Sequence, residues 1–244
     1  MKKIIVFTEG RSELIFVRHA LIQFIGYEHL SLKCFDLVSD RYREIPHKLE
    51  NSNALIYFEI INVGMDERVL SVIGEYCKKY IDLGFDIIGL RDMYSERYKK
   101  RSHQIDPRVN DYFQNITNEY IQHLERPEKI HFFFAIMEFE AWLIGLYHIF
   151  ERLDASLTPD SIRNQLGFDL ENTDPENIFF HPAVTFAQIL NIANIKYDKH
   201  GAEIESIISR INVDDIVRLV ESNRCNSFAL FFLKIQQVYE EAKS

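Results

Sequence analysis

The sequence contains little cysteine, and its few cysteines suggest no cross-linked or metal-bound framework. There are three of them, Cys34, Cys77 and Cys225, and they lie far apart along the 244-residue chain. An odd number of widely spaced cysteines predicts neither disulfide bonds nor a CxxC metal site, so a reducing compartment fits best. A chain of this length can bury a substantial core without such cross-links.

Long apolar runs are also missing. No segment approaches the roughly 20 apolar residues of a transmembrane helix. The first apolar run, residues 2–7, is too short for the core of a signal peptide and is soon followed by Glu9. We therefore expect a cytoplasmic protein. The formal net charge of −9 argues against a generally basic, nucleic-acid-binding surface and leaves only local basic patches as candidates.

Several catalytic signatures are absent as well. The turn TEGRSE at residues 8–13 lacks the glycines of GxGxxG and of GxxxxGK[ST], so a nucleotide-binding loop is not expected. The histidines show no HxxxH or HExxH spacing, which leaves a zinc hydrolase with little support. There is no GxSxG motif, and no cysteine lies in the sequence context of a nucleophile.

Apolar runs alternate with helical patterns in the first 140 residues. The runs predict strands at residues 3–7, 32–38, 54–63, 85–90 and 130–137. Helical spacing of apolar residues follows several of them, and from residue 141 onwards the patterns are mostly helical. This alternation predicts an α/β fold with a mainly parallel sheet flanked by helices. We expect an α/β domain over residues 1–145 and a helical extension over residues 146–244 that packs on it.

Acidic residues follow three of the predicted strands. They are Glu9, with Glu13 one helical turn later, then Asp92, and then Glu138 and Glu140. If these strands are parallel neighbours, their carboxylates converge at one edge of the sheet, where ligands gather in such folds. Carboxylates from separate strand ends suit Mg²⁺, and one or two such ions support phosphodiester chemistry. The alternative is that these residues are helix caps and first-turn acids stabilised by the helix dipole.

The spacing of Glu138 and Glu140 bears on this choice. The two side chains share one side if the strand continues through them, but they diverge by about 200° if a helix has begun. On a helix, at most one of the two reaches a site at the sheet edge.

Basic residues gather in two places. The larger run lies between residues 91 and 108, directly around Asp92, with Tyr94 and Tyr98 interleaved. Cations and aromatic rings together are typical of surfaces that neutralise and stack a nucleic acid, although a solvated loop has the same composition. The smaller cluster contains Lys196 and Lys199, and one of these lysines could stabilise a developing phosphorane charge.

Five motifs, taken in chain order, resemble a known family. They are TEGRSE, RDMY, MEFEAWL, KYDKHG and CNSF, and they cover the chain from Ile4 to Leu233. The first resembles the opening motif of Toprim domains, and the set resembles a bacterial family of uncharacterised Toprim-like proteins. That family is similar to the nuclease half of the overcoming-lysogenization-defect enzymes and is often encoded beside AAA or ABC-type ATPases.

The resemblance implies roles for particular residues. Glu9 and Glu13 match the first acidic motif, with Glu9 as a metal ligand or general acid/base, and Asp92 matches the second. The usual second aspartate of that motif is Tyr94 here, so Glu138 or Glu140 would supply the missing carboxylate. A further catalytic residue, Lys199, matches the basic residue of the fourth motif.

The resemblance also implies a function. It predicts a Toprim-like sheet and a nuclease dependent on Mg²⁺ or Mn²⁺, acting on DNA or RNA in defence against phage, with an AAA or ABC-type ATPase as partner. The alternative is a non-catalytic Toprim-like module that binds a partner ATPase or nucleic acid. A small-molecule phosphotransferase ranks last because no nucleotide loop is present, and a homo-oligomer is left open.

Overall fold

The computed structural model describes residues 1–39, 41–64, 67–198 and 202–244. It confirms an α/β fold with a six-stranded, mostly parallel sheet flanked by helices and a helical C-terminal region. The chain divides into two compact units. The first comprises Met1–Arg91, Arg108–Phe134 and Leu233–Ser244, and the second comprises Asp92–Pro107 and Ala135–Phe232. The predicted packing of residues 146–244 on an α/β domain stays a prediction.

The sheet has the strand order β3-β2-β4-β1-β5-β6. Its strands are β1 (Lys2–Thr8), β2 (Leu30–Val38), β3 (Arg41–Leu49), β4 (Ile56–Asn62), β5 (Phe85–Asp92) and β6 (Ile130–Ala135). β1 pairs in parallel with β4 on one side and with β5 on the other, and β2 pairs in parallel with β4. A strand with two parallel neighbours and helices on both faces must be apolar throughout, and Ile4 to Phe7 are fully buried.

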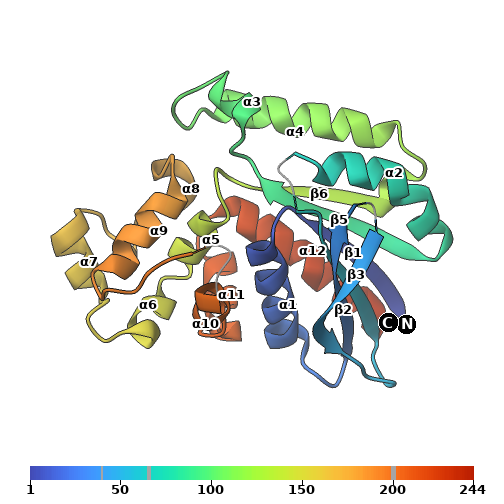
Figure 1. Cartoon of the computed structure of the whole chain (residues 1–244), viewed down its shortest axis with the longest axis horizontal. Coiled ribbons are helices and arrows are strands. Elements are labelled where there is room, and N and C mark those ends of the chain that lie inside the picture. The colour runs from blue at the N-terminus through green and yellow to red at the C-terminus, as the bar shows by residue number, and fades with distance from the viewer. Residues whose placement is uncertain (40, 65–66, 199–201) are drawn as a thin grey trace. The chain divides into compact units, whose positions relative to one another are not determined.

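Helices cover both faces of this sheet (Figure 1). Three of the helices flanking it are α1 (Arg11–Ile25), α2 (Val69–Asp82) and α4 (Pro107–Gln122). Ile5 and Phe7 of β1 belong to a buried cluster with Val72 and Ile73 of α2. Because side chains alternate along a strand, Ile4 and Val6 face the opposite side, where α1 contacts β1 and β4.

Strand β3 was missed by the sequence patterns. It pairs antiparallel with β2 at the edge of the sheet, and its side chains are half-buried or exposed. Its sequence, RYREIPHKL, is polar and contains Pro46. Charged residues and proline are typical of edge strands, because they discourage pairing with another chain, and for the same reason they hide the strand from a hydrophobic pattern.

The second unit is helical in the described segments beyond residue 140, as the sequence predicts. Its elements are α3 (Glu96–Lys99), α5 (Glu140–Gly145), α6 (His148–Leu153), α7 (Pro159–Leu166), α8 (Pro175–Ile178), α9 (Pro182–Asn191), α10 (Ala202–Ile208), α11 (Val213–Glu221) and the start of α12 (Asn226–Lys243). α5 is buried along its whole length, and its Trp142 packs against Phe228 and Phe231. No described helix is long and apolar enough to cross a membrane.

A buried carboxylate ties together three helices of this unit. Glu176 of α8 accepts hydrogen bonds from Trp142 Nε1 of α5 at 2.9 Å and from the backbone N of Ser227 in α12 at 3.1 Å. It also accepts one from the Ser227 hydroxyl. Burial raises the pKa of Glu176 to about 7, although the hydrogen bonds from Ser227 and Trp142 oppose this shift. Ionising this group in the folded protein is therefore unfavourable.

The raised pKa predicts a pH dependence of folding stability. The carboxyl has a usual pKa of 4.5 and a folded-state pKa of about 7, so the folded state binds the proton more tightly. Stability should therefore fall as pH rises from about 4.5 to about 7 and then level off. In wild type, Glu176 should lower the free energy of unfolding by on the order of 2 kcal/mol between pH 5 and pH 7.5. Glu176→Gln should remove this fall, as measured by urea unfolding. Exposed Glu205→Gln is the control, and an unchanged pH dependence in Glu176→Gln would contradict the assignment.

A second buried carboxylate, in the first unit, is held by two lysines. Asp86 of β5 accepts from Lys2 Nζ at 2.7 Å and from Lys129 Nζ at 2.5 Å. Burial alone would raise its pKa, but the hydrogen bonds and charges of Lys129 and Lys2 outweigh that effect and lower the pKa. This carboxylate therefore links β1 and β5 to the start of β6.

Asp86→Asn should destabilise the protein by about 1–3 kcal/mol at pH 7, because two partly exposed ammonium groups lose their common acceptor. A lowered pKa means that this stability is present above the usual value of 3.8 and is lost as pH falls. The difference between variant and wild type, followed by chemical denaturation, should shrink below about pH 4. A difference that is the same at pH 7 and pH 3 would show that charge is not its origin.

Candidate functional site

The carboxyl ends of three parallel strands meet at one edge of the sheet in the first unit. Thr8, the last residue of β1, pairs with Asn62 of β4 and with Leu90 of β5. After β1 the chain runs through α1 to β2, on the β4 side, whereas after β5 it continues towards β6 on the other side. The connections thus diverge between β1 and β5. In open α/β sheets, ligands bind beyond the strand ends at such a point of divergence.

A hydrogen-bonded turn carries Glu9 at this point. The Thr8 hydroxyl donates to the carbonyl oxygens of Gly10 and Ile61, at 3.2 and 3.3 Å. The backbone N of Gly64 donates to the Glu9 carbonyl at 3.1 Å. The turn is therefore anchored to the end of β4, which fixes where the Glu9 side chain leaves the sheet.

Glu9 lies beside a cation from the neighbouring strand. Its Oε2 is 3.8 Å from Nε of Arg91, and the two side chains are only 11% and 12% exposed. The Arg91 guanidinium also lies over the ring of Phe134, 5.6 Å from its centre. The sequence analysis assigned Arg91 only to a basic run. Its position directly after the apolar part of β5 could have identified it as a residue at the strand end, near Glu9.

Glu13 folds back over the start of α1. Gly10 is the N-cap of this helix and has no side chain to accept from the first turn. A Cβ added at Gly10 would lie 2.8 Å from Glu13 Oε2, so the carboxylate occupies the space that a side chain would take. Glu13 is 7% exposed. The first acidic motif therefore places Glu9 in the turn after β1 and Glu13 in the first turn of α1.

Asp92, at the end of β5, belongs to the second unit. Its Oδ1 accepts the backbone N–H of Phe139 at 2.7 Å, and its neighbours Met93 and Tyr94 donate backbone hydrogen bonds to Ala135 and Met137. Met137 has a positive φ of 63°. Asp92 thus stabilises the tight turn that leads from β6 into α5.

Glu138 and Glu140 point to different partners, because β6 ends at Ala135 and α5 begins at Glu140. Glu138 Oε2 accepts the backbone N–H of Ala183 in the first turn of α9, at 2.8 Å. Glu140 is fully buried and accepts a hydrogen bond from the hydroxyl of Tyr197.

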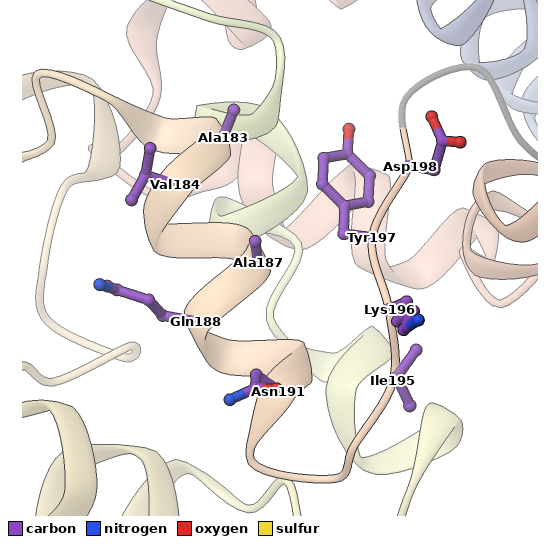
Figure 2. Close-up of a pocket in the computed structure, with 9 residues that line it drawn as sticks. All are labelled: Ala183, Val184, Ala187, Gln188, Asn191, Ile195, Lys196, Tyr197 and Asp198. Atoms are coloured by element: carbon purple, nitrogen blue, oxygen red, sulfur yellow. The ribbon is translucent and has the colours of Figure 1, made fainter.

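These two carboxylates support opposite walls of one groove. Figure 2 shows α9 on one side of it and the extended segment 195–198 on the other. The groove has a volume of about 720 Å³ and is lined by small, amide and aromatic side chains, among them Ala187, Gln188 and Tyr197. Glu138 holds the start of the helical wall, and Glu140 holds the tyrosine of the other wall.

The predicted ligands are therefore distributed over both units. Among the described residues, no three histidine, cysteine or acidic side chains gather as a metal-binding group. The predicted catalytic Lys199 lies outside the described residues. What the first unit offers by itself is two largely buried carboxylates, Glu9 and Glu13, of which Glu9 lies beside the Arg91 guanidinium.

Comparisons with protein-family models, with curated proteins and with solved structures found no match. The resemblance to Toprim-like proteins therefore stays a prediction from the motifs. The case for a function rests on the geometry of the first acidic motif and on its position in the sheet.

The packing of Glu13 over Gly10 can be tested without any assumption about activity. Gly10→Ala should cost about 0.5–1.5 kcal/mol of stability, because the new Cβ displaces the Glu13 carboxylate from its site. In a Glu13→Ala background the same change should cost less, because only the replacement of glycine at the N-cap remains. A double-mutant cycle by chemical denaturation measures the coupling. Equal costs in the two backgrounds would show that Glu13 does not lie over Gly10.

Proposed function

We propose that this protein is a phosphodiesterase dependent on Mg²⁺ or Mn²⁺, a nuclease of the Toprim type, with Glu9 and Glu13 as its acidic residues. One observation carries the proposal. The Glu9–Glu13 turn follows the central strand of a parallel sheet at the point where the connections diverge, which is where ligands of such folds bind. The motif resemblance supports the same reading.

The residues present fit a hard cation. Mg²⁺ takes oxygen ligands, keeps several waters and is commonly bound by one or two carboxylates together with substrate phosphate. Glu9 and Glu13 supply carboxylates that are largely removed from solvent and stand four positions apart in the sequence, on either side of the start of α1. A divalent cation would be attracted by each of these carboxylates. When bound, the ion polarises the phosphate and lowers the pKa of a coordinated water.

The chain's own residues then have distinct roles. Glu9 would hold the cation or take a proton from the attacking water, and Glu13 would supply a second carboxylate. Arg91 binds a non-bridging phosphate oxygen, for which its guanidinium geometry is suited. The predicted ligand roles of Asp92, Glu138 and Glu140 stay predictions, as do the ATPase partner and the role in defence.

A second function has some structural support. It is a non-catalytic module that binds nucleic acid or a partner ATPase. In the second unit each of the three predicted acidic ligands accepts a hydrogen bond from the protein: Asp92 from Phe139, Glu138 from Ala183 and Glu140 from Tyr197. Side chains with these bonds act as caps and braces without any metal.

Calorimetric titration of Mn²⁺ distinguishes the two. Wild type and the control Glu75→Gln, an exposed change on α2, should bind the ion, whereas Glu9→Gln should lose at least tenfold in affinity because one anionic ligand is gone. The same samples incubated with plasmid DNA and total RNA should show cleavage that disappears with Glu9→Gln. Circular dichroism confirms that each variant is folded.

Retained cleavage in Glu9→Gln would rule out the assigned role of Glu9. Absence of Mn²⁺ binding in all three proteins, at millimolar ion, would support the non-catalytic module instead.

A further inference from the structure

Four aromatic side chains from two distant segments pack together in the second unit. Tyr94 meets Phe180 edge-on at 5.5 Å and His181 at 5.1 Å between ring centres. Phe180 and His181 are themselves 4.7 Å apart, and Tyr98 lies 6.4 Å from Phe180. The pairing joins residues of the basic run to the residues that precede α9, about 80 positions later, so no sequence pattern suggested it.

The cluster has a fixed base and an accessible edge. Tyr98 is fully buried, and its hydroxyl accepts the backbone N–H of Asp106 at 3.0 Å. Tyr94 and Phe180 are half-buried, and His181 is exposed. His181 is also fixed in the backbone, because it is the N-cap of α9 and is followed by Pro182. We call Tyr94, Phe180 and His181 the aromatic platform.

One cation borders the aromatic platform. Lys99 Nζ lies 5.1 Å from the ring centre of Tyr94 and also pairs with the exposed Glu96 carboxylate at 2.6 Å. Residues 96–107 contain four Arg or Lys and only two acidic residues, in a chain whose net charge is −9. Lys100 is exposed in this segment. Rings to stack on, with ammonium groups beside them, are what a flexible polyanion with planar bases requires.

We propose that the aromatic platform binds single-stranded nucleic acid, with bases stacked on His181 and Phe180 and phosphates neutralised by Lys99 and Lys100. A single strand is favoured over a duplex, because the bases of a duplex are already stacked on one another and cannot reach the rings. An acidic peptide would satisfy the lysines but would leave the rings without a partner. This inference deepens the proposed function by naming its substrate class, and it rests on that function only for the cleavage step.

Binding can be measured without cleavage. Fluorescence anisotropy of a labelled 12-nucleotide DNA strand, titrated with the full chain in EDTA, reports binding whether or not the protein is a nuclease. His181→Ala and Phe180→Ala should each weaken binding by about 5- to 150-fold, since stacking contributes about 1–3 kcal/mol for each base. His181→Phe should retain most of the affinity because it keeps a ring. Tyr112→Ala removes an exposed aromatic of α4 in the other unit and should change nothing.

An abasic strand of the same length separates stacking from charge. Wild type should bind the abasic strand more weakly than the normal strand. His181→Ala should not lower the affinity for the abasic strand any further. Lys100→Ala should weaken binding of both strands. Thermal unfolding verifies that every variant is folded.

The proposal would be overturned by any of the following results: no binding of the normal strand, equal affinity for normal and abasic strands, or equal affinity for the single strand and a duplex. The proposal would also be overturned if polyglutamate displaced the labelled strand at the same concentration as an unlabelled oligonucleotide does. That result would show that the surface binds acidic peptides. If the protein binds the strand in EDTA but shows no Mn²⁺ binding by calorimetry, this inference stands and the proposed nuclease function is ruled out.

Discussion

The position of β1 between two parallel neighbours is the constraint on which the candidate site depends. This strand is paired on both sides and covered on both faces, so Ile4 to Phe7 are buried. Its pairing with β4 and β5 ends at Thr8, and the chain therefore leaves the sheet at Glu9. The next helix starts at once, and Gly10 leaves room for the Glu13 carboxylate above its first turn. Apolar pairing within the sheet thus determines where two acidic side chains are presented.

The sequence predicts this part of the molecule because its signals are local. A short apolar run, an acidic turn and a helical pattern succeed one another between residues 3 and 24, and each is visible in one window. The α/β class follows from the same alternation. Strand β3 escapes prediction because its stability comes from pairing with β2 and not from burial of its own side chains.

Partners that are distant in sequence could not be predicted in this way. Glu138 meets the backbone of Ala183, Glu140 meets Tyr197, and Tyr94 meets His181, and each contact depends on how the helices of the second unit pack. The same is true of Asp86, whose two lysines lie 84 positions before and 43 positions after it. A carboxylate after a strand is thus recognisable from sequence, but whether it braces a helix or faces a ligand is decided by tertiary contacts.

The central claim is that Glu9 and Glu13 hold a divalent cation at the end of β1. Anomalous diffraction from crystals of the wild-type protein grown with Mn²⁺ tests it most directly, because the signal locates the ion without reference to activity. The account predicts an anomalous peak within coordination distance of the two carboxylates, about 2.0–2.6 Å from their oxygens. Well-ordered Glu9 and Glu13 side chains with no peak between them, at millimolar Mn²⁺, would contradict it.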